Sequence, residues 1–360
     1  MTSRERVTAA LLRQPVDRVP VFMWFHPDTA AILAKHLGIA PHQVDEAMGN
    51  DVRQVWVGNN YAMEGIVHEH EGETHTDAWG ITWVREGQFN QVRHSPLAQA
   101  SEEELAAYTF PYGAIPHLMQ QLERIRPYTG TSFIGADVSP CLFELLCRVR
   151  GMEQAIEDLA LQPEVSASLF GRATEFSLAL TDAAFRTLPL DWLWTGDDVA
   201  GQQCMMMNPR QWRSLIKPHL ARIVAAGATR NVPVAYHCCG AMRDIIPDLI
   251  EIGITVLNPI QHGCSGMDAA ALKRDFGASL TFMGGLDTIG LIPRGSAGDV
   301  YAATRDLIEV MTADGGGFIL AASHTIPPET PVANIFAMYA AAGITGEEIF
   351  GNAVTIRSRR

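Results

Sequence analysis

The sequence predicts an α/β chain folded as a (β/α)₈ TIM barrel, because short apolar runs and helical stretches alternate eight times along it. Most of the runs are separated by a stretch long enough for a helical crossover between parallel strands. Barrels of this kind reach this length as one domain, so a single domain over residues 1–360 is expected. The eight expected strands are 19–24, 52–57, 132–136, 191–195, 232–237, 254–257, 279–283 and 318–322.

The expected helices begin and end at residues with recognisable capping chemistry. Thr2 and Ser3 are suited to cap a first helix that runs to about Leu12. Pro27 opens the next helix, and Gly38 closes it. The remaining helices are expected over about 101–107, 115–126, 139–160, 163–187, 208–227, 241–252, 267–276, 298–313 and 330–342.

Residues 67–93 differ from the rest of the chain and predict a β-hairpin excursion between the second and third strands. His, Glu, Thr and Trp alternate there with turn residues at Glu71-Gly72 and Glu86-Gly87. Trp79 and Trp83 would be large apolar surfaces on an exposed hairpin. The excursion is therefore expected to cover the barrel mouth or an oligomer contact, such as that of a homodimer.

Composition and charge exclude several classes of partner. The chain has 360 residues, 47% of them hydrophobic, and its formal net charge of −13 gives no footprint for nucleic acid or an anionic membrane. No apolar run reaches the ~18 residues of a membrane span, and the N-terminus lacks the apolar core of a signal peptide. The six cysteines are too unevenly spaced for a disulfide framework. We expect a cytoplasmic protein with reduced thiols.

Polar residues and potential metal ligands follow nearly every predicted strand. In a (β/α)₈ barrel the functional site lies at the carboxyl ends of the strands, where these residues would meet. Without a function there, such residues would be scattered between both ends of the barrel. The residues are Asn59, Asn60, Asp137, Asp197, Asp198, His237, Cys238, Cys239, Asn258, Gln261, His262, Asp287, Ser323 and His324.

The fifth predicted strand ends in His237-Cys238-Cys239, which indicates part of a metal site. Side chains alternate along a strand, so His237 and Cys239 point to one side and Cys238 points to the other. An imidazole and a thiolate on the same side are two ligands of a zinc site. His324 follows the last strand and opens onto the same mouth. We therefore expect zinc at His237, Cys239 and His324.

Three carboxylates at the mouth have functional and structural interpretations. Asp197 and Asp198 follow a buried strand and are assigned to catalysis; they could bind substrate or orient a ligand histidine, and capping of the next turn is the structural alternative. Asp287 is assigned to the substrate site or to the orientation of a metal ligand, and the alternative is that it caps a helix.

Amide and further donor side chains complete the predicted site. Asn59, Asn258 and Gln261 are assigned to substrate binding, with loop closure as the alternative interpretation. His262 and Cys264 repeat the spacing of the predicted ligand pair and are additional metal candidates, although loops also carry such residues without any metal.

A set of short motifs extends over almost the whole chain: Arg4-Glu5-Arg6, Pro15-Val16-Asp17-Arg18-Val19-Pro20, Asp77-Ala78-Trp79-Gly80, Gly196-Asp197-Asp198, His237-Cys238-Cys239-Gly240, Leu257-Asn258-Pro259-Ile260-Gln261 and Gly284-Gly285-Leu286-Asp287. In this order the set resembles the uroporphyrinogen decarboxylase superfamily, and within it the cobalamin-dependent methyltransferases. Each motif alone is weak, but the ordered set is specific. The resemblance implies a (β/α)₈ barrel, in agreement with the alternation of strands and helices.

Two positions separate the branches of this superfamily. True decarboxylases carry an Arg-Gln-Ala-Gly-Arg signature for substrate carboxylates near the N-terminus, and an aspartate after strand two for the pyrrole nitrogens. Here the first position reads Trp24-Phe25-His26-Pro27-Asp28 and the second reads Gly58-Asn59-Asn60. The resemblance therefore implies that uroporphyrinogen is not the substrate.

The methyltransferase branch has His-x-Cys followed much later by a second cysteine. His237 and Cys239 match the pair, whereas the later cysteine aligns with His324, a departure that still supplies a zinc ligand. With Cys239 as the only protein thiolate, a zinc site keeps about one positive charge. That charge suits Lewis-acid activation of a methyl donor with an oxygen or nitrogen leaving group.

The favoured function is zinc-dependent methyl transfer between a corrinoid (cobalamin), carried by a partner protein, and a small O-methyl or N-methyl substrate or a thiol. Two other hypotheses stay open. One is a lyase or decarboxylase of a small carboxylic acid, to which the missing arginine clamp is the main objection. The other is a non-catalytic subunit that binds metal or docks a corrinoid protein.

Overall fold

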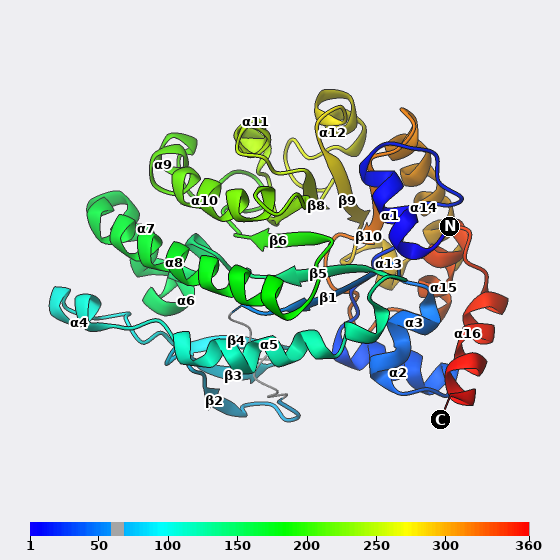
Figure 1. The fold of residues 1–360 in the computed structure, drawn as a ribbon, viewed down its shortest axis with the longest axis horizontal. Coiled ribbons are helices and arrows are strands. Elements are labelled where there is room, and N and C mark those ends of the chain that lie inside the picture. The colour runs from blue at the N-terminus through cyan, green and yellow to red at the C-terminus, as the bar shows by residue number, and fades with distance from the viewer. Residues whose placement is uncertain (59–67, 360) are drawn as a thin grey trace.

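A parallel sheet that curls into a barrel wall forms the centre of the computed structural model, which describes residues 1–58 and 68–359 (Figure 1). In sheet order its seven strands are β1 (Val52–Trp56), β5 (Phe133–Asp137), β6 (Trp192–Gly196), β7 (Val234–His237), β8 (Val256–Ile260), β9 (Thr281–Leu286) and β10 (Phe318–Ala322). Each strand pairs in parallel with the next along the chain, so the carboxyl ends of all seven lie at one edge. The predicted α/β fold of TIM-barrel type is confirmed.

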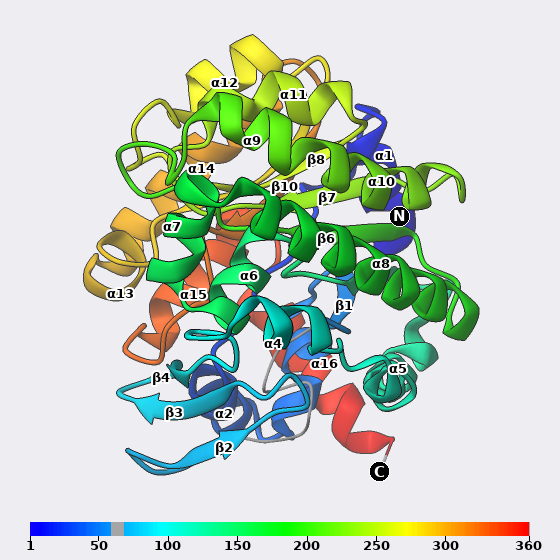
Figure 2. The ribbon, with the colours of Figure 1, turned by 90° about the vertical axis from the view of Figure 1, so that its left-hand side faces the viewer.

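Helices cover the outside of the sheet, as the two views show (Figure 1, Figure 2). They are α1 (Ser3–Leu11), α2 (Pro27–Leu37), α3 (Val44–Met48), α4 (Glu102–Ala107), α5 (Ile115–Glu123), α6 (Phe143–Arg150), α7 (Met152–Leu161), α8 (Pro163–Thr187), α9 (Pro209–Leu215), α10 (Lys217–Ala228), α11 (Ile246–Glu251), α12 (Ala269–Phe276), α13 (Leu291–Arg294), α14 (Ala297–Thr312), α15 (Val332–Ala341) and α16 (Gly346–Ser358). None of the helices within the described residues has the length and apolar character needed to cross a membrane.

Helix α1 packs against the amino-terminal ends of the strands. Its N-terminus is fixed by a capping box, in which Thr2 accepts from the backbone N–H of Glu5 and Glu5 accepts from that of Thr2. Val7 of α1 is fully buried among interior side chains that include Val52 and Phe133, which are the first residues of β1 and β5. This end of the barrel is therefore filled with apolar side chains, and the carboxyl-terminal end is left for a site.

The predicted first strand, 19–24, is the main departure from expectation, because the structure contains no assigned strand there. Val21 forms only an isolated parallel bridge with Leu320 of β10. On its other side, the backbone N–H groups of Val21 and Met23 donate to the side chains of Asp51 (2.8 Å) and Asn50 (3.2 Å). Backbone hydrogen bonds to Leu320 and from Asp51 to Val21 are thus supplemented by side-chain acceptors, and the segment spans the gap between β10 and β1 without becoming a regular strand.

The other strands are confirmed, with small shifts of their ends. The strand at 318–322 is found with those bounds, whereas 254–257 becomes Val256–Ile260 and 279–283 becomes Thr281–Leu286. The shift places Asp137 and Asn258 inside strands instead of in the loops that follow. Because side chains alternate along a strand, this position determines which way each of them points.

The excursion between β1 and β5 is an antiparallel sheet of three strands, β2 (Thr74–Thr76), β3 (Thr82–Glu86) and β4 (Phe89–His94) (Figure 1). Trp79 and Trp83 are buried against the chain itself: the ring of Trp79 lies 4.8 Å from that of Phe176 in α8. Trp83 Nε1 donates to Asp77 (2.8 Å). The two tryptophans thus give no reason to expect an oligomer contact, and the premise of that expectation was wrong.

The tip of the excursion lies close to the barrel mouth. The backbone carbonyl of Gln88, between β3 and β4, is 2.9 Å from Nε2 of His26. The ring of Phe89 contacts the same imidazole edge-on at 5.4 Å. His26 follows the segment that replaces the first strand, so the tip of the excursion covers one side of the mouth.

Candidate metal centre

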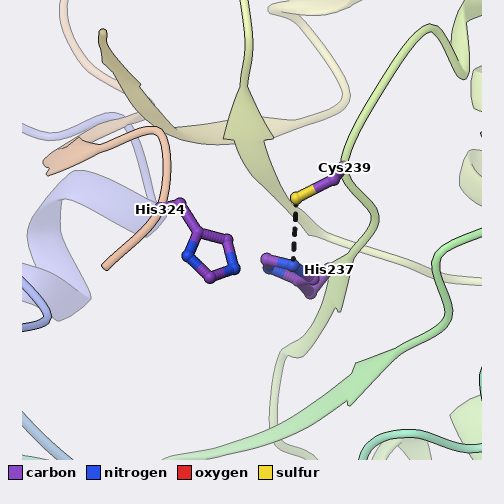
Figure 3. Close-up of side chains that lie close together, drawn as sticks. All are labelled: His237, Cys239 and His324. Atoms are coloured by element: carbon purple, nitrogen blue, oxygen red, sulfur yellow. Dashed lines mark hydrogen bonds between the residues drawn. The ribbon is translucent and has the colours of Figure 1, made fainter. Parts of the chain in front are cut away.

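Three donor side chains from two distant parts of the chain meet at the carboxyl ends of the strands. His237 ends β7, Cys239 follows two residues later, and His324 lies two residues beyond β10 (Figure 3). One ring nitrogen of each histidine and the Sγ of Cys239 all lie within 4.8 Å of one another. These are the three residues that the sequence predicts as ligands, and the fold brings them together.

The imidazole of His237 is held in one orientation by the neighbouring strand. Asn258 is its register partner in β8, and Asn258 Oδ1 lies 2.6 Å from His237 Nδ1. The amide oxygen accepts the Nδ1 proton, so Nε2 keeps its lone pair. Nε2 lies 3.6 Å from Cys239 Sγ, about the distance between two ligands of one tetrahedral zinc ion. Asn258, predicted to bind substrate, is thus placed to orient a ligand.

The loop that carries Cys239 is fixed by two side chains of the predicted site. Asp198 Oδ1 accepts from the backbone N–H of Cys239 (2.7 Å), and Gln261 Oε1 accepts from that of Gly240 (2.7 Å). Gly240 has φ +96°, and a Cβ there would lie 2.6 Å from the carbonyl oxygen of Ala200. Glycine is therefore required directly after the thiol, because any other residue would displace the loop.

Burial keeps two of the three donors, the Cys239 thiol and the His324 imidazole, in their uncharged forms. Burial, together with Asp198, raises the pKa of the Cys239 thiol above its ordinary value, and a divalent metal would reverse this by stabilising the thiolate. The ring of His324 keeps solvent contact, yet the surrounding barrel desolvates its charged form. This desolvation and the nearby His237 lower the pKa of His324 to about 4. His324 is therefore a neutral donor at pH 7.

Two of the predicted carboxylates hold helices. Both oxygens of Asp197 accept backbone N–H groups at the start of α6, from Phe143 (2.8 Å) and Glu144 (2.7 Å), and burial raises the pKa of Asp197 to about 7. Asp287 accepts from the backbone N–H groups of 289–291 at the start of α13. Asp287 therefore matches the capping alternative, whereas Asp197 caps a helix that precedes it in the chain and not the next turn.

The remaining predicted residues have separate positions. Asn59 lies outside the described residues. His262 is exposed, and Cys264 Sγ lies 3.7 Å from Gln261 Oε1. Neither belongs to the group of donors that the described part of the chain brings together.

The interior residues next to His237 were not recognised from the sequence. The ring of Trp24 lies 5.8 Å from that of His237, and the ring of Trp194 lies 6.5 Å from it. The signal that was available is alternation, because Phe22 and Trp24 occupy every second position of the segment and share one face.

The sequence pattern of the Uroporphyrinogen decarboxylase (URO-D) family matches residues 2–343. The chain belongs to this family. A uroporphyrinogen decarboxylase from Thermus thermophilus is 24% identical over 257 residues, which are 68% of this chain and 69% of that protein. Among solved structures, a methyltransferase from Methanosarcina mazei has a TM-score of 0.74 and 19% identity, covering 95% of this chain and 98% of that one. At this identity the likeness establishes a shared fold.

Within this URO-D family barrel, Asn258→Ala is expected to lower the affinity for zinc about 10- to 100-fold. His237 would lose the acceptor that keeps its proton on Nδ1 and its lone pair on Nε2. Competition with a chromophoric chelator at pH 7 measures the affinity. Cys264→Ala is the control and is expected to bind zinc like the wild type. An unchanged affinity in Asn258→Ala would exclude the orienting role.

Proposed function

We propose that this URO-D family protein is a zinc-dependent methyltransferase. It moves a methyl group between a small methylated substrate or a thiol and a corrinoid carried by another protein. The observation that carries the proposal is the group formed by one thiol and two imidazoles at the barrel mouth. The methyltransferase of Methanosarcina mazei, whose fold this chain shares, adds support.

His237, Cys239 and His324 would hold the metal, which supplies a positive charge that polarises a bound substrate atom. With a single thiolate in the set, about one positive charge remains, and we propose that this favours activation of a methyl donor over activation of a thiol. Asp198 and Asn258 keep Cys239 and His237 in place without binding the metal themselves.

Decarboxylation of a carboxylic acid is the second candidate, because the Thermus thermophilus relative bears the name of a decarboxylase. Such a reaction needs a fixed positive charge for the carboxylate. Trp24 packs in the barrel interior with the apolar core, and His26 is engaged with the carbonyl of Gln88. Neither of these two positions of the decarboxylase signature holds an arginine, so this candidate is weaker.

The test is methyl transfer to free cobalamin in its Co(I) state, with a panel of methoxy and N-methyl compounds. Metal-loaded protein is expected to form methylcobalamin with at least one donor, followed by its absorption spectrum, and chelator-treated protein is expected to form none. Release of CO₂ from a carboxylic acid by metal-free protein, without methyl transfer, would contradict the proposal. Full metal content without transfer from any donor would indicate a non-catalytic subunit.

The direction of transfer is tested by His324→Cys, which adds a second thiolate. The added negative charge lowers the residual charge of the metal site, so a methyl donor is polarised less and a bound thiol becomes more nucleophilic. We expect His324→Cys to retain zinc and to transfer methyl groups from a donor about tenfold more slowly. A rate equal to or above that of the wild type would instead indicate a thiol-methylating enzyme.

A further inference from the structure

Three tryptophans line the barrel interior beside the metal centre, and we call them the aromatic wall: Trp24, Trp56 and Trp194. The ring centroid of Trp24 lies 5.8 Å from that of Trp56 and 5.4 Å from that of Trp194. It also lies 5.8 Å from the imidazole of His237. The rings of Trp24 and Trp194 therefore adjoin His237, one of the three donor side chains.

A carboxyl group with an unused oxygen lies within the wall. Asp137 in β5 is the register partner of Trp56 on one side and of Trp194 on the other. It is 1% exposed, and its Oδ1 accepts from the backbone N–H of Ser139 (2.8 Å). Its buried Oδ2 makes no hydrogen bond of normal geometry among the described residues, and the Trp56 side chain is the donor beside the carboxyl group. Burial raises the pKa of Asp137 well above its ordinary value. Such a group is costly and points to a function.

A cavity opens against the wall. It has a volume of about 330 Å³ and is lined by Trp24, Gln54 and Trp56, and by Thr325, the residue after His324. Asp45 and Arg124 also line it, so the cavity carries one group of each sign. It therefore has room for a small organic molecule against Trp24 and Trp56, although the three donor side chains do not themselves line it.

One carboxylate of the mouth lies beside the wall. The Asp198 side chain is 35% exposed, and its Oδ1 lies 3.8 Å from Nε2 of His237, whose ring adjoins that of Trp24. Glu144 of α6 is paired with Arg148 (2.5 Å), so their charges offset each other. The carboxylate of Asp198 attracts a cation to this side of the mouth, whereas Arg124 in the cavity lining has the opposite effect.

We propose that the aromatic wall binds the positively charged nitrogen of a methylated amine, such as a methylammonium or trimethylammonium group. The quadrupole of an indole face attracts a cation, and tryptophan does so more strongly than phenylalanine or tyrosine. Asp137 adds a negative charge behind the wall once a cation stabilises its ionised form.

As a choice of substrate class, this inference rests on the proposed function. An ammonium nitrogen has no lone pair for a metal, so for this donor the positive charge on nitrogen, and not polarisation by the metal, makes the amine a leaving group. In the transfer the bond between the methyl carbon and nitrogen breaks, and its electron pair stays on nitrogen. The carbon forms its new bond with the electron pair of a reduced corrinoid acceptor. The ammonium leaves as a neutral amine that the wall no longer attracts, which favours its release.

The test uses a pair of probes that differ only in charge: choline and its neutral isostere 3,3-dimethylbutan-1-ol. Titration calorimetry on the full chain, with and without zinc, is expected to show choline binding about tenfold or more tightly than the isostere. Equal affinities for the two probes would overturn the proposal without any variant being made.

Phe substitutions test whether the tryptophans of the aromatic wall cause the preference for choline over its isostere, because phenylalanine keeps apolar packing but has the weaker quadrupole. Trp24→Phe, Trp56→Phe and Asp137→Asn are each expected to lose most of the preference for choline and to bind the isostere as before. Trp83→Phe, in the excursion, is the control and is expected to keep the preference. Thermal melting and zinc content check that each variant is folded.

The two proposals fail in distinguishable ways. If an O-methyl donor is demethylated but choline and its isostere bind equally, the methyltransferase function stands and the cation site is wrong. If choline is preferred but no N-methyl compound transfers its methyl group, the wall is a cation site and the proposed reaction is wrong.

Discussion

Cys239→Ala is expected to lose zinc almost completely, with an affinity lowered about a hundred-fold or more, and to lose methyl transfer with it. Cys239 is the only sulfur in the group of three donors, and its Sγ lies 3.6 Å from Nε2 of His237. No neighbouring group of the described donor set replaces a thiolate. Metal analysis after dialysis, together with chelator competition, measures the loss.

The adjacent Cys238→Ala is the matched control and should retain zinc. Cys238 is fully buried, and its Sγ faces the backbone carbonyl of Cys239 at 3.3 Å. Its replacement removes one buried sulfur and leaves the donors untouched. Equal zinc content in both variants would mean that the metal, if bound, is held elsewhere.

Asp51→Ala is expected to lower the free energy of unfolding by about 3–5 kcal/mol. Asp51 is completely buried at the start of β1 and pairs with Arg6 (2.6 Å) and Arg18 (2.7 Å). It also accepts from the backbone N–H of Val21, which helps to close the barrel between β1 and β10. The variant would leave buried guanidinium charge and a buried N–H group without their acceptor.

Asp17→Ala is the control for this effect, because Asp17 pairs with the same Arg6 (2.6 Å) from the surface. Its side chain is 41% exposed, so its removal is expected to cost about 1 kcal/mol or less. Urea unfolding at pH 7, followed by tryptophan fluorescence, gives both values. Similar losses in the two variants would show that burial of Asp51 does not matter.

Capping residues and buried apolar runs made most of the fold predictable. Gly38 adopts φ +67° and ends α2 where expected, since few other residues adopt a left-handed conformation. β10 has its predicted bounds because its five residues form one continuous apolar run, all of it buried, and this run marks where the strand begins and ends. The segment 19–24 was mispredicted, since it forms only one bridge with β10 and, on the β1 side, the side chains of Asn50 and Asp51 accept two of its backbone N–H groups, which strand propensity does not reveal.

The site was predictable to the extent that it follows from strand topology. Parallel strands bring their carboxyl ends together, so His237 and His324 could be expected to meet despite their distance along the chain. Whether a polar residue there binds a ligand or a backbone group was not predictable. Asp197 and Asp198 are adjacent, yet one caps α6 and the other holds Cys239.

The sequence by itself determined the fold class and the donor triad. Apolar periodicity is a local property, and the alternation of strands and helices along the chain implies parallel strands whose carboxyl ends meet. The tertiary structure alone decided that Asn258 faces His237, that Trp56 and Trp194 flank Asp137, and that Trp24 packs against both tryptophans. These relations depend on register and on the side of the sheet each residue faces. A shift of one residue reverses that side, and only the packed barrel sets it.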